Sequence, residues 1–200
     1  VVLKPSDKAP AVGQLLAQTL REALDECGAP PGVVNMVQGK ADVASRLVAH
    51  PGVDGVLFTG SWPVGRKILE SNLDTPGRIV ALEMGGNNAA VVLDDADLRQ
   101  AAIECARCAF ISTGQRCTCT RRIILHEKIA DRFIRALVEA ARSATVGDPL
   151  ADPPVFMGPI IREESRTDAL AFADALVTGG AEPLLAPRAV EVPGCTGGHF

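Results

Sequence analysis

Cys117 and Glu83 are the side chains in this sequence that are best suited to nucleophilic chemistry. Cys117 lies next to Arg116 in the loop sequence GQRCTC, and Glu83 lies upstream in LEMGGNN. The glycines in both segments let a substrate or another backbone approach closely. A cysteine acts as a nucleophile in its thiolate form, and a nearby carboxylate can accept a proton. The two residues therefore predict a cysteine nucleophile and a glutamate base.

A third segment, GSWPVG, has the features of a phosphate-binding turn. It follows an apolar run and opens a helical pattern, with proline at a position that the first helical turn tolerates. Such a helix N-terminus holds a pyrophosphate through free backbone N–H groups. The segment differs from the common GxGxxG motif, so a purely structural turn is an open alternative. The coenzyme-binding residues predicted here are Gly60, Ser61, Trp62, Pro63, Val64 and Gly65.

In their order along the chain, GSWPVG, LEMGGNN and GQRCTC, the three segments resemble the aldehyde dehydrogenase superfamily. The pair Phe58-Thr59 before the turn adds to the likeness, which extends from Lys4 to the FMGP turn at 156–159. The resemblance implies that Cys117 attacks an aldehyde, that NAD accepts the hydride, and that Glu83 activates the water that hydrolyses the thioester. It also implies that the Cys117 N–H and an asparagine from before Val1 hold the oxyanion.

The family places ribose-binding groups at the end of the first strand, where this chain has Lys4, Ser6 and Asp7. The resemblance implies that Lys4 donates to the ribose hydroxyls and that Asp7 accepts from the 2′ hydroxyl. A carboxylate there repels a 2′-phosphate and so favours NAD over NADP. Aspartate is one methylene shorter than the glutamate that is frequent in the family. Capping of the first helix by Ser6 or Asp7 is the alternative role.

The details of the motifs are most similar to family members that oxidise N-succinylglutamate 5-semialdehyde in bacterial arginine breakdown. Two asparagines follow the two glycines, where many relatives have lysine. A small-molecule aldehyde with two carboxylates also suits a site near arginines. Those arginines are equally suited to surface or interface ion pairs. They are Arg116, Arg121 and Arg122.

The cysteines also allow other interpretations. Cys105, Cys108, Cys117 and Cys119 form a CxxC and CxC array that could hold zinc. However, Cys105 and Cys108 fall on an apolar helical face, where core positions are expected, and an extended chain would turn Cys119 away from the side of Cys117. We predict no metal site. No histidine accompanies Cys117, which disfavours a cysteine protease.

Glu83 could be an ordinary surface carboxylate at a strand end. Its apolar neighbours Leu82 and Met84 and the two following glycines instead predict restricted access of water. A partly desolvated carboxylate is a better base near neutral pH.

Short β-branched runs alternate with amphipathic helical patterns, which predicts an α/β fold: a Rossmann-like parallel sheet with helices on both faces, followed by the start of a second α/β domain. An apolar stripe on the first helix, through Val12 and Leu16, is expected to pack on the sheet. Asp94, Asp95 and Asp97 predict a helix N-cap. The expected strands are 1–3, 33–37, 56–59, 79–82, 89–93 and 123–125, and the expected helices begin near 10, 41, 62, 98, 129 and 163.

Residues 1–86 are predicted to be part of an NAD-binding domain and residues 87–200 part of a catalytic domain. Net charge is −4, with no basic stripe and no apolar run of membrane-spanning length, so we expect no nucleic-acid or membrane partner, a cytoplasmic location and reduced thiols. The resemblance implies a homo-oligomer, either a dimer or a tetramer.

The chain is expected to be an internal portion of a longer enzyme. The family's upstream asparagine and its downstream Glu-x-Phe clamp on the coenzyme are both missing from it, so the 200 residues alone are expected to bind NAD poorly. Two alternatives stay open: an acylating relative that transfers the acyl group to CoA or phosphate, and a non-catalytic truncated module.

Overall fold

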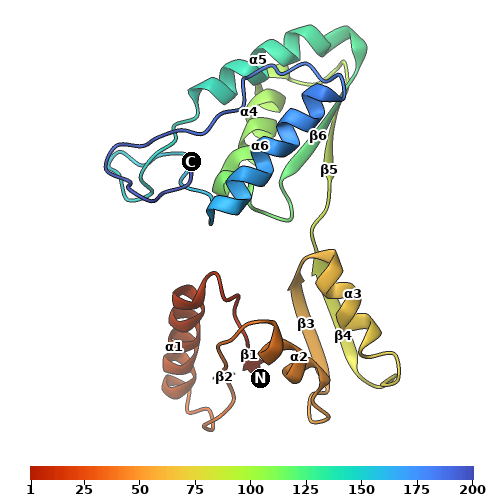
Figure 1. Ribbon diagram of the computed structural model, residues 1–200, viewed down its shortest axis with the longest axis vertical. Helices are drawn as coiled ribbons and strands as arrows, with labels where there is room; N and C mark the ends of the chain where they lie inside the picture. Colours follow the sequence, from red (N-terminus) through yellow and green to blue (C-terminus); the bar gives the residue numbers. More distant parts are fainter. The chain divides into compact units, whose positions relative to one another are not determined.

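The computed structural model describes residues 1–200, which form two compact units, Val1–Met84 and Gly85–Phe200 (Figure 1). This division falls two residues before the predicted boundary between residues 86 and 87. The assignment of coenzyme binding to the first unit and of catalysis to the second stays a prediction.

In the first unit, strands and helices alternate along the chain, and both pairs of strands are parallel. The second pair is the longer, running in register from Gly55 opposite Ile79 to Gly60 opposite Met84. The elements are β1 (Val2–Leu3), α1 (Pro10–Glu26), β2 (Asn35–Met36), α2 (Ala41–Ala49), β3 (Gly55–Gly60), α3 (Trp62–Glu70) and β4 (Ile79–Met84).

The second unit contains a parallel strand pair and the better packed core. Phe133 is fully buried at the centre of this core, among Val92, Ala102, Cys105 and Ile129. The elements are β5 (Asn88–Val92), α4 (Leu98–Phe110), the 3-10 segment η1 (Ile111–Gly114), β6 (Thr120–Leu125), the 3-10 turn η2 (Glu127–Ile129), α5 (Ala130–Ser143) and α6 (Glu163–Thr178).

The α/β class with parallel strands is confirmed, and α2 and α6 begin at the predicted residues, 41 and 163. The strands form three separate two-stranded ladders within these 200 residues, where the pattern predicts a broader sheet. The Asp97 carboxylate caps α4 by accepting hydrogen bonds from the N–H groups of Arg99 and Gln100, as the aspartate cluster predicts.

Two predictions about burial are wrong. The apolar stripe of α1 is exposed at Val12 and Leu16, because the adjacent strands are only two residues long and the single buried residue of the helix is Gly13. On α4, Cys108 is exposed, and the buried stripe is completed by Ala106 in its place. No helix combines the length and apolar character needed to cross a membrane.

Candidate functional site

Cys117 lies in an exposed turn between η1 and β6. The turn is closed by a hydrogen bond of 3.4 Å from the Cys119 N–H to the Arg116 carbonyl. The chain is not extended at this point, because β6 begins only at Thr120, so the alternation considered for Cys119 does not apply. The two neighbouring thiols nevertheless differ in environment, since Cys119 is 2% exposed. Cys117 is therefore accessible to a substrate, and Cys119 is packed in the protein.

The backbone before this turn adopts an unusual conformation. Ser112, Thr113 and Gly114 all have φ near the left-handed region, at 54°, 55° and 68°. This conformation is sterically unfavourable for serine and threonine by about 1–3 kcal/mol each, whereas glycine adopts it with little strain. The Thr113 hydroxyl donates to the Gly158 carbonyl at 2.9 Å, which helps to fix this conformation. A β-carbon at Gly114 would lie 3.1 Å from the carbonyl oxygen of Ala109.

The side chains of Asn88 and Arg121 hold the carbonyl groups of the turn. The Asn88 amide nitrogen donates to the carbonyls of Cys117 at 2.7 Å and of Cys119 at 3.1 Å. The Arg121 guanidinium donates to the carbonyls of Gly114 at 2.7 Å and of Arg116 at 3.4 Å. The sequence signal for Asn88 is the second asparagine of GGNN, which carried only a family likeness.

The three arginines near Cys117 form no ion pair within the chain. Arg116 donates to the Ser112 hydroxyl at 3.0 Å, and Arg122 donates to the Asn87 carbonyl at 3.0 Å. Their guanidinium groups, all on exposed residues, therefore brace the loop and keep their positive charge uncompensated.

Glu83 is the penultimate residue of β4 and lies opposite Thr59 of β3. Because the strands are parallel and end together, Glu83 shares an edge of this ladder with Gly60 and the start of α3. Alternate residues of β4 are half-buried, and Glu83 belongs to the exposed set. The expected restriction of water around Glu83 is absent in this unit, where the residue is exposed.

The predicted phosphate-binding turn has a geometry that suits an anion. Ser61 is the N-terminal residue before α3, and its hydroxyl makes no capping hydrogen bond, so it is available to a ligand. Gly60 lies against the Phe58 ring, which would have to move to admit a β-carbon at this position. Gly65 is buried against Leu82 and Met84, so it brings α3 close to β4. Trp62 and Val64 are exposed on the first turn, which Pro63 helps to start.

The residues at the end of β1 are free of helix capping. The N-cap of α1 is Ala9, and no side chain caps it, so the alternative role for Ser6 and Asp7 is wrong. The Ser6 hydroxyl accepts from the Lys8 N–H at 3.2 Å. Lys4 donates to the Pro5 carbonyl at 2.8 Å, and Asp7 is exposed.

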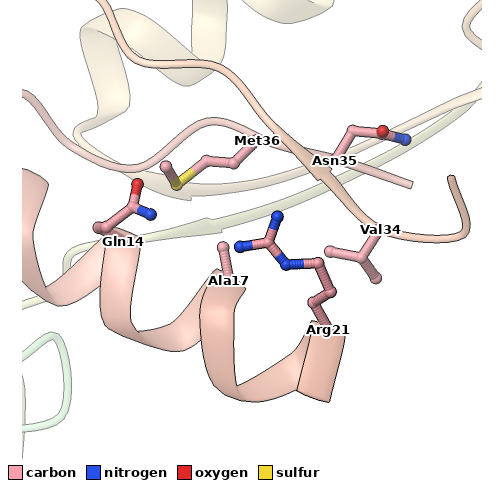
Figure 2. Close-up of a pocket in the computed structure, with 6 residues that line it drawn as sticks. All are labelled: Gln14, Ala17, Arg21, Val34, Asn35 and Met36. Carbon is pink, nitrogen blue, oxygen red and sulfur yellow. The ribbon is translucent and has the colours of Figure 1, made fainter. Parts of the chain in front are cut away.

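A shallow pocket of about 300 Å³ lies between α1 and β2 (Figure 2). It contains no thiol or carboxylate and none of the predicted site residues, so it offers no groups for this chemistry. Its lining residues are Gln14, Ala17, Arg21, Val34, Asn35 and Met36.

The four cysteines of the possible zinc array do not form a metal site. No group of three or more His, Cys, Asp or Glu side chains is arranged to hold a metal ion. Cys105 is buried in the core, and burial together with the neighbouring Cys108 and Glu104 raises the pKa of its thiol. Cys105 is therefore a core residue with little thiolate at neutral pH.

The aldehyde dehydrogenase family model matches residues 1–200. The chain is 46% identical over 165 residues to N-succinylglutamate 5-semialdehyde dehydrogenase of Sphingopyxis alaskensis, covering 82% of the chain and 34% of that relative. It thus spans about a third of the length of that curated relative.

Solved structures of dehydrogenases also match this chain. The NAD-dependent aldehyde dehydrogenase from Sinorhizobium meliloti matches with a TM-score of 0.90 and 36% identity, over 100% of this chain and 38% of that chain. Glyceraldehyde-3-phosphate dehydrogenase from Methanocaldococcus jannaschii, solved with NADP, matches with a TM-score of 0.87 and 34% identity, over 94% and 40%.

Proposed function

Because the chain belongs to the aldehyde dehydrogenase family, we propose that the complete protein oxidises an aldehyde to a carboxylic acid through a thioester on Cys117, with NAD as the hydride acceptor. The observation that carries the proposal is the exposed Cys117 in a turn whose carbonyl groups are held by side chains. A nucleophile needs both access to substrate and a fixed orientation.

Cys117 and Glu83 have successive roles in the proposed reaction. The Cys117 thiolate adds to the aldehyde carbon, and its own N–H, which donates to no acceptor within the chain, is free to stabilise the oxyanion. NAD bound to the first unit would supply the hydride acceptor, and Cys117 would then carry the acyl group as a thioester. Glu83 then takes a proton from water, the water oxygen attacks the thioester carbon, and the acid and the Cys117 thiolate are released.

The first unit supplies the proposed NAD site. The N-terminus of α3 and the free Ser61 hydroxyl suit the pyrophosphate, since aligned peptide dipoles favour an anion at that end. Lys4 and the exposed Asp7 suit the ribose, and the Asp7 carboxylate favours NAD over NADP. Residues 1–86 are thus proposed as coenzyme-binding and residues 87–200 as catalytic.

The proposed substrate is N-succinylglutamate 5-semialdehyde, an intermediate of arginine breakdown. Support comes from the relative of that name and from the unpaired positive charge around the Cys117 turn. The exposed Arg116 is best suited to a substrate carboxylate, because the only hydrogen bond of its guanidinium group is to a hydroxyl. By the family resemblance, the complete protein is expected to form dimers or tetramers.

Replacement of Cys117 by alanine tests the proposal. In the complete protein, Cys117→Ala is expected to abolish aldehyde-dependent NADH formation, measured by absorbance, because it removes the thiol that is proposed to form the thioester. NAD binding, measured by calorimetry, is expected to persist.

The matched control is Cys108→Ala, which removes another exposed thiol from the same unit. Its turnover is expected to equal that of the unchanged protein. Undiminished turnover in Cys117→Ala would refute the proposed function.

A further inference from the structure

We propose that Asn88 is a positioning residue that fixes the orientation of Cys117 for catalysis. This inference rests on the proposed function, because it assigns Asn88 a role in the reaction of that thiol. The evidence is the contact between the start of β5 and the Cys117 turn, two segments about 30 residues apart that both belong to the second unit.

Both N–H groups of the Asn88 amide donate hydrogen bonds to the turn. It bonds the Cys117 carbonyl at 2.7 Å and the Cys119 carbonyl at 3.1 Å, so it bridges the two sides of Thr118. The amide orientation follows from the partners, since an oxygen in that place would face two carbonyl oxygens. A β-carbon at Gly86 would lie 3.2 Å from the Asn88 amide oxygen, so the glycine leaves room for this arrangement.

The β5–β6 ladder has an irregularity next to Asn88 and Arg121, the two residues whose side chains bind the Cys117 turn. Asn88 pairs with Thr120, but the next residue, Ala89, pairs with Arg122, so Arg121 is an extra residue in β6. Such bulges redirect side chains near functional sites. Here Arg121 reaches back to the carbonyls of Gly114 and Arg116, on the other side of the turn from the carbonyls held by Asn88.

Together these contacts fix both peptide planes that flank Cys117. Arg121 holds the carbonyl of the plane that carries the Cys117 N–H, and Asn88 holds the carbonyl of the plane that follows. Because each peptide is planar, holding both planes fixes φ and ψ of Cys117. The direction of its Cα–Cβ bond is then set relative to the oxyanion donor, and the thiol is confined to the staggered χ1 positions about that bond.

Asn88→Ala in the complete protein tests the proposal, with Asn87→Ala as the matched control. The Asn87 side chain makes no hydrogen bond within the chain, although it is adjacent and also exposed. The measured quantity is kcat per reactive Cys117 thiol, counted by peptide-resolved alkylation, so that a loss of folded protein does not enter. The KM for NAD is measured in the same assay.

For Asn88→Ala, kcat per thiol is expected to fall about tenfold, which corresponds to ~1.4 kcal/mol of lost transition-state stabilisation. The KM for NAD is expected to stay unchanged, and Asn87→Ala to behave as the unchanged protein. Asn88→Ser, which keeps one shorter donor, is expected to fall between the two and serves if the alanine variant is poorly folded.

Equal kcat per thiol in the Asn88 and Asn87 variants would overturn the inference and leave the proposed function intact. Undiminished turnover in Cys117→Ala would instead remove the proposed function itself, so the two failures are distinguishable.

Discussion

The cysteines of this chain occupy environments that differ enough to rank their reactivity. Cys117 and Cys108 are exposed, whereas Cys105 and Cys119 are buried. Cys105 is buried, and its thiol pKa is raised mainly by that burial. The thiolate is the reactive form, so both access and protonation disfavour reaction at Cys105.

We predict the order in which these cysteine thiols are alkylated by iodoacetamide. Cys117 and Cys108 are expected to react first at neutral pH. Cys105 is expected to lag and to react faster as pH rises toward its raised pKa, since more thiolate then forms. Peptide mass spectrometry after timed quenching measures each rate. Alkylation of Cys105 at the rate of Cys108 at neutral pH would contradict the assigned environments.

At the scale of helices and strands, contacts between neighbouring residues could be predicted from the sequence, and contacts between distant residues could not. The N-cap of α4 could be predicted because it depends on Asp97 and the next three residues. The Asn88 contacts with the turn could not be predicted, because they join residues 29 and 31 positions apart. The exposure of the α1 stripe was also unpredictable, because periodicity indicates an apolar face without showing what covers it.

The Asp97 cap of α4 predicts a measurable contribution to the stability of the protein. Asp97→Ala is expected to lower the free energy of unfolding by about 1 kcal/mol, because two backbone N–H groups at the helix start lose their acceptor. Urea denaturation of the complete protein measures the change. Asp95→Ala, an exposed neighbour without a side-chain hydrogen bond, is the control, and equal effects of the two substitutions would refute the capping role.

At the scale of the whole molecule, the two units differ in how well they are packed. The second unit has a cluster of buried residues around Phe133, on β5, α4 and α5. In the first unit, large apolar side chains such as Leu15, Leu57 and Ile79 are mostly exposed, and Ile68 is the only buried one. Local stability follows buried apolar contacts.

We therefore predict that hydrogen exchange in the 200-residue chain is much faster in α1 than in α5. Exchange followed by peptide mass spectrometry measures both helices in one sample, with α5 as the internal reference. Equal protection of the two helices would show that the apolar stripe of α1 is covered in solution.

The central claim is that Cys117 carries the acyl group, and its most direct test is to trap that group. The complete protein with Glu83→Gln is mixed with NAD and N-succinylglutamate 5-semialdehyde, quenched in acid, digested and analysed by mass spectrometry. Because glutamine cannot take the proton from water, an acyl group is expected on the peptide that contains Cys117, after about one NADH per active site has formed. Steady NADH formation with that peptide unmodified would contradict the account.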